Sequence, residues 1–135
     1  MQKPKQRSKL RIFFGKIFYA IKKYLYWNWS RINFAKKFEN YLLFEIFHHQ
    51  TFLRRSLKDV EMWMQENKIE NLKIAVKKLD GLVIEPGQIF SYWRQIGKPT
   101  KKKGYVPGMV LHDGSVQAGI GGGLCQLSNL IYWMT

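Results

Sequence analysis

A chain of 135 residues suits one domain of ordinary size, and 46% hydrophobic residues supply the material for a core. This composition excludes an intrinsically disordered chain. The formal net charge is +14, and eleven lysines and arginines precede the first acidic residue, Glu39. The single cysteine, Cys125, excludes an internal disulfide framework and leaves the redox compartment open.

The N-terminal segment, residues 1–37, is basic and rich in aromatic residues. Apolar residues recur in it at helical spacing, as in a helix that lies in a membrane headgroup region or packs on the rest of the protein. They are Phe14, Ile17, Phe18, Ile21 and Leu25. The longest uncharged run, residues 24–30, is far shorter than the roughly 20 residues that span a bilayer.

The charge and the short apolar runs bear on location and partners. The pattern of a signal peptide is missing, so we expect a cytoplasmic protein or one peripheral to the cytoplasmic membrane. An anionic membrane surface is a candidate partner for the basic segment. Nucleic acid is a weaker alternative, because no recognisable nucleic-acid motif accompanies the charge.

Three further helices are predicted before residue 80. Residues 35–47 contain neither Gly nor Pro, and a second helix is expected from an approximate capping box at Ser56 and Asp59 to residue 67. The clearest helical pattern covers residues 69–79, with Gly81 as its C-terminal stop. Its apolar stripe is Ile69, Leu72, Val76 and Leu79.

From residue 82 the pattern changes to that of short strands and turns. The predicted elements are a strand at 82–84, a turn at 85–87, a strand at 89–93, a basic loop at 97–104 and a helix at 124–134. Between them, Asp113-Gly114 predicts a hairpin of residues 109–112 and 115–118. The fold class is therefore α+β: a helical N-terminal half packed on a small, mostly antiparallel sheet, ending in a glycine-rich loop and a helix.

The last predicted helix carries an apolar stripe of Leu127, Leu130, Ile131 and Met134, and no capping residue follows it. Such a stripe needs a partner that covers it. We therefore expect the sequence to be a fragment of a longer chain.

The densest chemical signal is the stretch at residues 119–128. Consecutive glycines allow unusual backbone conformations and close approach of another segment or a ligand. They place Cys125 in the first turn of the last helix, where unpaired amides and the helix dipole favour a thiolate. A thiolate attacks carbonyl carbon, and free amides there could hold an oxyanion. Cys125 is the candidate nucleophile, and the candidate pocket or oxyanion turn is Gly121, Gly122, Gly123, Gln126 and Ser128.

The alternative for Cys125 is a small buried side chain without chemistry. A catalytic cysteine needs a base, normally a histidine, and His48, His49 and His112 form no evident dyad with it. Whether the protein is an enzyme therefore stays open. Neither a phosphate loop nor a dinucleotide fingerprint is present, and the spacing of Cys and His does not match a structural zinc site. The sequence predicts no metal and no cofactor.

Three ordered stretches resemble blocks of the VanW family: NLKIAVKKLDG at 71–81, EPGQIFSYW at 85–93 and GGGLCQLSNLIY at 121–132. The resemblance covers residues 71–135 and implies a partial family domain at 38–135, preceded by the basic segment 1–37. It implies an accessory protein of bacterial cell-envelope metabolism and glycopeptide-antibiotic resistance. It also implies that further strands and a histidine-bearing segment follow in complete members.

Two kinds of function remain open under this resemblance. The complete protein would be a cysteine-dependent acyl-transfer or hydrolytic enzyme that acts through Cys125. Alternatively it would be a non-catalytic module that docks on a membrane through residues 1–37 and recognises a wall precursor or another peptidoglycan-related ligand.

Overall fold

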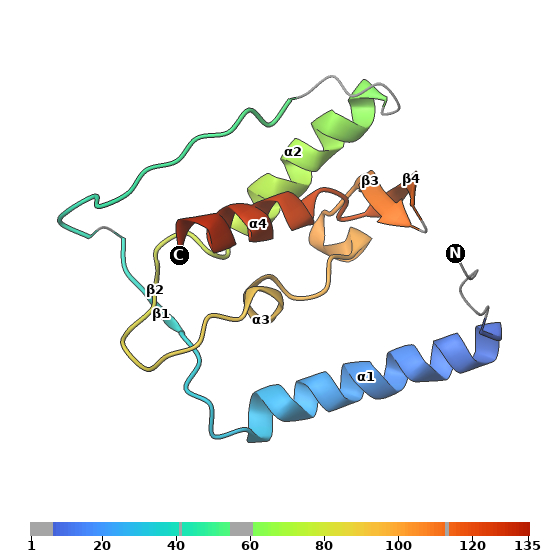
Figure 1. Cartoon of the computed structure of the whole chain (residues 1–135), viewed down its shortest axis with the longest axis horizontal. Helices are drawn as coiled ribbons and strands as arrows, with labels where there is room; N and C mark the ends of the chain where they lie inside the picture. The colour runs from blue at the N-terminus through green and yellow to red at the C-terminus, as the bar shows by residue number, and fades with distance from the viewer. Residues whose placement is uncertain (1–6, 41, 55–60, 113) are drawn as a thin grey trace.

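The computed structural model describes residues 7–40, 42–54, 61–112 and 114–135. The elements in chain order are α1 (Lys9–Trp29), β1 (Lys37–Phe38), α2 (Met62–Val76), β2 (Leu82–Val83), α3 (Tyr92–Ile96), the 3-10 turn η1 (Lys101–Lys103), β3 (Pro107–His112), β4 (Ser115–Ile120) and α4 (Leu124–Met134) (Figure 1). Strand β1 pairs antiparallel with β2, and β3 pairs antiparallel with β4. The α+β fold class is confirmed.

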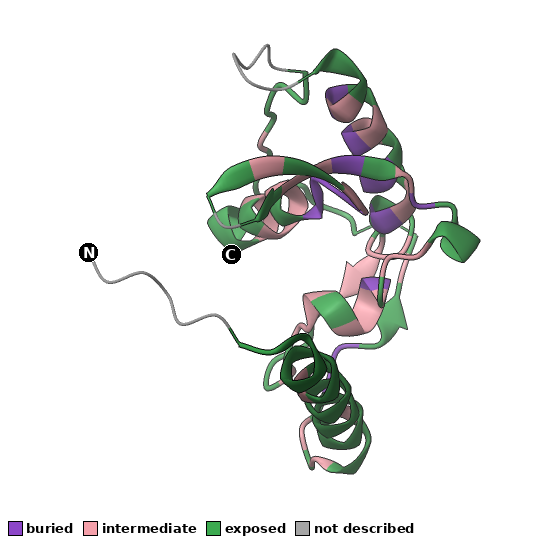
Figure 2. Cartoon of the chain, turned by 90° about the vertical axis from the view of Figure 1, so that its right-hand side faces the viewer, coloured by how far each residue is buried: buried purple, intermediate pink, exposed green. Residues whose placement is uncertain are grey.

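The core lies where α2, α4 and the start of β3 meet, and Figure 2 shows buried residues gathered along one side of α2. It consists of Leu72, Ala75, Ile96, Tyr105 and Leu124. Of the predicted apolar stripe on α2, only Leu72 is buried, whereas Gln65, Lys68 and Asn71 are buried as well. Helix α2 therefore turns a largely polar face inward. These side chains are polar because the segments that pack against α2 present backbone carbonyl groups to it.

The predicted hairpin is confirmed, and its ladder extends beyond the expected ends. Strand β3 pairs with β4 from Pro107 opposite Ile120 to His112 opposite Ser115. Gly114, in the turn, has a φ of +77°, which a residue with a side chain rarely adopts. The other end of the hairpin leads directly into the glycine run and α4, so the hairpin positions the candidate site.

The helix predicted at residues 35–47 is wrong. Part of this stretch is β1, and residues 42–54 form no regular element. The backbone amides find partners far along the chain instead: Ala35 N–H donates to Ile89 O at 3.1 Å and Glu39 N–H donates to Gly81 O at 2.9 Å. Once these amides pair with distant carbonyls, a local helix cannot form here.

The strand predicted at residues 89–93 is also wrong, because only Ile89 forms a β-bridge, to Phe34, and α3 begins at Tyr92. The carbonyl of Ser91 accepts from Arg94 N–H and Gln95 N–H, which starts that helix. The predicted basic loop contains η1. The capping box predicted at Ser56 and Asp59 lies outside the described residues.

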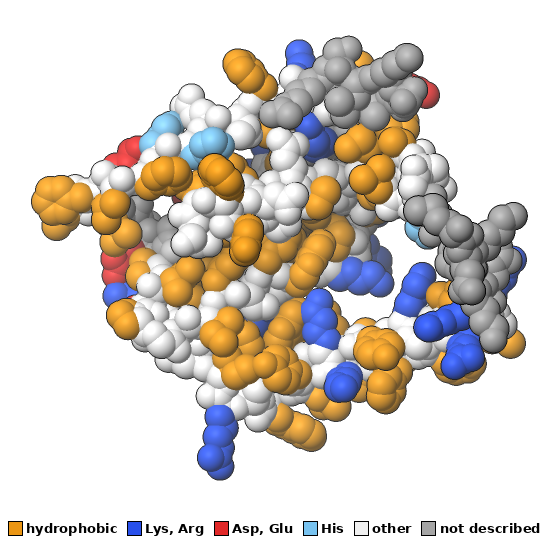
Figure 3. Space-filling model, viewed as in Figure 1, with side chains coloured by type: hydrophobic (Ala, Val, Ile, Leu, Met, Phe, Trp, Pro, Cys, Tyr) orange, Lys and Arg blue, Asp and Glu red, His pale blue; other side chains and the backbone are white. Residues whose placement is uncertain are grey.

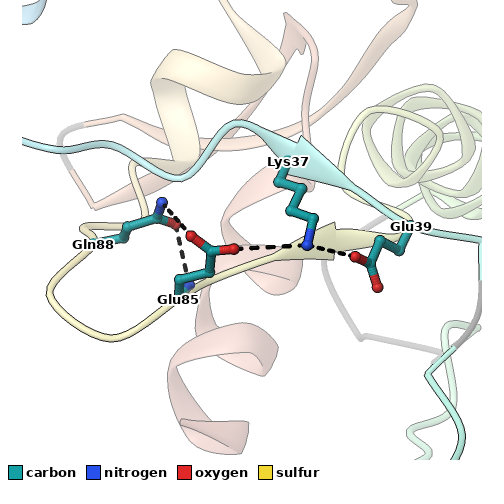
Figure 4. A network of polar contacts seen from close by, with 4 residues as sticks. All are labelled: Lys37, Glu39, Glu85 and Gln88. Atoms are coloured by element: carbon teal, nitrogen blue, oxygen red, sulfur yellow. Dashed lines mark hydrogen bonds and ion pairs between the residues drawn. The ribbon is translucent and has the colours of Figure 1, made fainter.

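A small polar network joins β1 to the turn that follows β2 (Figure 4). Lys37 Nζ lies 2.6 Å from Glu39 Oε1 and 3.7 Å from Glu85 Oε1. Gln88 Nε2 donates to Glu85 Oε2 at 3.3 Å, and Gln88 Oε1 accepts from Glu85 N–H at 3.1 Å. The hydrogen bond to Glu39 and the charge of Glu39 raise the pKa of Lys37. Because these groups are exposed, the network orients the turn more than it stabilises the fold.

Helix α1 runs along one side of the molecule, apart from α2, α4 and the hairpin (Figure 1). Its N-cap is Ser8, whose hydroxyl accepts from Arg11 N–H, and none of its residues is buried. Among the described residues, no helix has both the length and the apolar character needed to cross a bilayer.

Candidate functional site

The glycine run between β4 and α4 packs tightly on three sides, and all three of its residues are buried. A Cβ on Gly121 would lie 2.5 Å from Pro99 Cβ, one on Gly122 would lie 2.1 Å from the carbonyl carbon of Gly108, and one on Gly123 would lie 2.2 Å from Lys68 Cγ. Gly121 and Gly123 also have positive φ values, of +75° and +90°. Glycine is therefore required at each position by close approach of neighbouring segments.

Asn71 of α2 joins the glycine run to the start of β3. Its side chain is fully buried, and its Nδ2 donates to Val106 O and to Gly122 O, each at 3.0 Å. Its Oδ1 accepts from Val106 N–H at 2.9 Å. The amide thus uses both donors and its acceptor, and one helix side chain fixes the backbone at both Val106 and Gly122. We call residues 121–125, which join β4 to the first turn of α4, the glycine–cysteine corner.

Two neighbours of Asn71 on α2 extend this polar face. Asn67 Nδ2 donates to Pro107 O at 2.7 Å, a hydrogen bond that links α2 to the first residue of β3. Lys68 is buried against Gly123, and its Nζ donates to Gln65 Oε1 at 2.6 Å and to the carbonyl of Leu53. These contacts hold the corner against α2 and bring residues 49–53 beside it.

Cys125 is the second residue of α4, and its thiol is free and exposed. Cys125 is therefore not a buried side chain in this structure. Gln126 N–H donates to Gly123 O at 3.0 Å. The backbone amides of Leu124 and Cys125 donate to no carbonyl group of the described backbone, as is usual for the first residues of a helix. Ser128 Oγ donates to Cys125 O at 2.9 Å. The thiol thus lies beside free amides at the positive end of a helix dipole.

Two tyrosines lie close to this helix start. The hydroxyl of half-buried Tyr92 donates to Leu124 O at 2.8 Å, and the hydroxyl of buried Tyr105 has no hydrogen-bond partner among the described residues. Burial, followed by the charges of Tyr105 and Cys125, raises the pKa of Tyr92. Burial likewise raises the pKa of Tyr105. Tyr92 therefore lies within electrostatic range of both Tyr105 and Cys125.

The raised pKa of Tyr92 predicts a loss of stability in alkaline solution. Above pH ~10 the phenol ionises in the unfolded chain but stays neutral in the folded one, so the free energy of unfolding falls as pH rises. At pH 8, Tyr92→Phe should lower the free energy of unfolding by about 1 kcal/mol, because the variant lacks the hydrogen bond to Leu124 O. Between pH ~9 and ~11 its free energy of unfolding should then decline less steeply than that of the wild type.

Urea unfolding across this pH range measures the effect of Tyr92→Phe. Tyr132→Phe, at a phenol whose residue is 85% exposed, is the control and should keep the wild-type dependence. Equal slopes for Tyr92→Phe and the wild type would contradict the prediction.

Two adjoining hollows lie between α2, α4 and residues 49–53, with volumes of about 590 Å³ and 480 Å³. Both are lined by His49, Thr51, Gln126 and Leu130. The first is mainly apolar, with Leu53, Leu72, Val76 and Leu127 in its wall, and the second includes Lys68 and Gln65. Cys125 lines neither hollow. The candidate site residues predicted from the sequence therefore lie in two different places. Gln126 lines the hollows, whereas Cys125 lies on the side of Tyr92.

None of the three histidines lines either hollow together with the thiol. His48 Nδ1 is 3.2 Å from Glu45 Oε1, His49 lines the hollows, and His112 is exposed at the end of β3. No hydrogen bond between described residues joins a histidine to Cys125. Nor do the described parts of the chain contain a cluster of three or more His, Cys, Asp or Glu that could hold a metal ion.

Comparison with known proteins now identifies the family. A family model described as VanW like protein matches residues 67–135, just over half of the chain, and includes the whole glycine–cysteine corner. The chain belongs to the VanW-like protein family, and the resemblance seen in its three sequence blocks is confirmed.

Two curated relatives are similar to part of the chain. The vancomycin B-type resistance protein VanW of Enterococcus faecalis is 41% identical over 98 residues, which cover 70% of this chain and 33% of that protein. The uncharacterized protein YoaR of Bacillus subtilis is 30% identical over 67 residues, which cover 50% of this chain and 22% of that protein. The chain thus matches a third or less of each relative's length. No solved structure matches it.

Proposed function

We propose that the protein acts in the bacterial cell envelope as an accessory factor of vancomycin resistance. The observation that supports this role is the 41% identity over 98 residues to a protein named for vancomycin B-type resistance. Because the family model covers residues 67–135, the shared part of the molecule contains Asn71, Cys125 and the glycine run between β4 and α4. The glycine–cysteine corner is therefore the site to which we assign the activity.

Within this role we propose that Cys125 is the nucleophile of an acyl-transfer or hydrolytic reaction. Its exposed thiol at the second position of α4, beside the amides that begin the helix, supports this assignment. The thiolate would attack the carbonyl carbon of an amide or ester. A C–S bond forms, the bond to the leaving group breaks, and the leaving group takes up a proton. Water or an acceptor amine then cleaves the thioester, loses a proton and restores the thiolate.

The amides at the start of α4 would stabilise the oxyanion in this reaction, since those of Leu124 and Cys125 have no partner in the described backbone. The close packing of Gly121, Gly122 and Gly123 supports the same role, because a rigid turn keeps such donors oriented before the substrate arrives. Tyr92 would hold the helix start in place through its bond to Leu124 O.

Cys125→Ser tests the nucleophile directly. Because the residue is exposed, the free energy of unfolding should change by less than ~0.5 kcal/mol. In a bacterial host whose vancomycin resistance depends on this gene, resistance should fall to the level of a strain that lacks the gene. The thiol of the folded wild-type protein should react with iodoacetamide near pH 7 at least as fast as it does in urea.

Two outcomes would refute the nucleophile. One is full resistance with Cys125→Ser, and the other is slow alkylation that accelerates on unfolding. Tyr132→Phe is a matched control, since it changes an exposed side chain on the same helix outside the candidate site and should leave resistance unchanged.

A binding function without catalysis is the second candidate, and the hollows beside Gln126 support it. Their volumes of about 590 Å³ and 480 Å³ lie within the range of small-ligand sites. A soluble peptidoglycan stem peptide would then bind there, and Leu130→Asp would weaken its binding in a calorimetric titration. If resistance survives Cys125→Ser but is lost with Leu130→Asp, the site binds and does not react.

A further inference from the structure

The side chains of α1 are left uncovered along the whole helix. None of its 21 residues is buried, and its large apolar side chains other than Trp27 have exposed fractions that range from 42% at Ile17 to 81% at Trp29. Figure 3 shows hydrophobic and basic side chains interleaved along this helix. Exposed apolar surface of this extent marks an interaction site.

Nine apolar residues of α1 occupy one continuous face. At about 100° per residue, they share an arc about 160° wide that contains no charged residue. We call it the apolar arc, and its apolar members are Leu10, Phe13, Phe14, Ile17, Phe18, Ala20, Ile21, Tyr24 and Leu25. The remaining large apolar residues lie outside this arc: Ile12, Tyr19, Tyr26, Trp27 and Trp29.

Basic residues border the apolar arc on both sides. Arg11 and Lys22 follow it at one edge, and Lys9, Lys16 and Lys23 at the other. No acidic residue precedes Glu39 in the sequence, so none neutralises these charges from within the helix. An apolar face between two basic edges is the arrangement of a helix that lies in the plane of a membrane.

The contact of α1 with the rest of the protein leaves the apolar arc free. Lys23 Nζ lies 4.4 Å from the ring centre of Trp27 and 5.9 Å from that of Trp93 in α3. Trp27 is the half-buried aromatic residue of α1, and it lies with Lys23 at the basic edge. The helix therefore meets the rest of the molecule by an edge, while the apolar arc faces elsewhere.

We propose that α1 docks on a membrane that contains anionic lipid, with the apolar arc in the headgroup and upper acyl region and its basic edges on the lipid phosphates. The positive charge of α1 is complementary to an anionic lipid surface, which favours this partner over the alternatives. A second copy of the chain would bring the same uncompensated positive charge to the contact, and nucleic acid would leave the apolar arc in water. Because the helix carries five cations, it lies along the surface and does not cross the bilayer.

This inference is independent of the chemistry at Cys125. Co-sedimentation of the full chain with vesicles tests it. Binding to phosphatidylcholine vesicles that contain about 30% phosphatidylglycerol should be at least roughly tenfold stronger than binding to pure phosphatidylcholine. It should weaken at least roughly tenfold between about 50 mM and about 500 mM NaCl. Equal binding to both vesicles, or no binding to either, would overturn the proposal.

Paired variants assign the binding to the apolar arc. Phe14→Ser with Phe18→Ser changes residues that are 65% and 63% exposed, and should reduce vesicle binding at least roughly tenfold. Tyr19→Ser, at a residue 68% exposed on the opposite face, is the matched control and should bind as the wild type does. Equal losses in the two variants would refute an assignment to this face, and circular dichroism verifies that both remain folded.

Charge variants test whether vesicle binding depends on the basic edges of α1 or only on the overall positive charge of the protein. Lys16→Glu with Lys22→Glu should abolish the preference for anionic vesicles. The same charge change at Lys101 and Lys102 in the exposed turn η1 should remove a much smaller part of it. If both pairs lose equal affinity, α1 is not the docking element. If analytical ultracentrifugation without lipid shows a dimer that Phe14→Ser with Phe18→Ser dissociates, the apolar arc belongs to a second copy.

Discussion

Gly122→Ala should lower the free energy of unfolding by about 3 kcal/mol, because the added methyl group has no space. Its Cβ would lie 2.1 Å, 2.3 Å and 2.6 Å from the carbonyl carbon, carbonyl oxygen and Cα of Gly108. All three are backbone atoms, so no side-chain rotation relieves the overlap. The corner would have to move away from β3, and Gly122 O would then lose its bond to Asn71 Nδ2. Urea unfolding followed by far-ultraviolet circular dichroism measures the change.

Two other alanine substitutions separate this overlap from effects of the backbone alone. Gly87 has a φ of +78° and open space around it, so Gly87→Ala should cost only the conformational strain, about 1 kcal/mol. Gly15 lies inside α1, also with open space, so Gly15→Ala should raise helix stability by roughly 0.5–1 kcal/mol. A Gly122→Ala effect no larger than that of Gly87→Ala would show that the close packing at the corner is not required.

The elements that the sequence predicted well depend on local chemistry. The β3–β4 hairpin follows from the Asp113-Gly114 pair in the sequence, whose glycine has a φ of +77°. Helix α4 follows from an apolar stripe directly after a glycine run, and the exposed position of Cys125 in its first turn agrees with that pattern. In each case the residues that decide the conformation lie within a few positions of one another, so a single sequence contains the information.

The predictions that were wrong concern backbone whose partners are distant in sequence. A helix at residues 35–47 is locally plausible, yet Ala35 and Glu39 donate to carbonyls of Ile89 and Gly81. The same long-range pairing stops at Ile89, which leaves residues 92–96 free to form α3. Neither outcome follows from propensity, because tertiary contacts override weak local preferences.

The buried polar side chains of α2 were not predicted from the sequence, for a related reason. Gln65, Lys68 and Asn71 recur every three residues, which is the pattern expected of a solvated helix face. This face is buried because the segment opposite presents backbone carbonyls and amides instead of apolar side chains. One signal was present in the sequence: asparagine has a low helix propensity, and Asn71 lies in the interior of α2.

Asn71→Leu should be the most destabilising substitution on α2, because it removes every partner that the side chain provides. Gly122 O would be left buried and Val106 N–H partly buried, each without a bond, and together these losses cost about 4 kcal/mol. Val106 O would be less affected, since it also accepts from Gly121 N–H at 3.1 Å. The variant should unfold at a much lower urea concentration, and the corner that presents Cys125 should exchange its amide hydrogens faster.

Asn71→Asp separates the loss of the donor from the loss of volume. The new carboxylate could still accept from Val106 N–H, but it would face the carbonyl oxygens of Val106 and Gly122 in a buried site. Burial and those oxygens would raise its folded-state pKa above the roughly 3.9 of the unfolded chain. The variant should therefore come closest to wild-type stability near pH 4 and lose free energy of unfolding, relative to the wild type, as pH rises to 7. Asn67→Asp, one turn earlier at an exposed bond to Pro107 O, should cost less than about 1 kcal/mol at pH 7. Equal costs for the two aspartate variants at pH 7 would show that Asn71 does not hold the corner together.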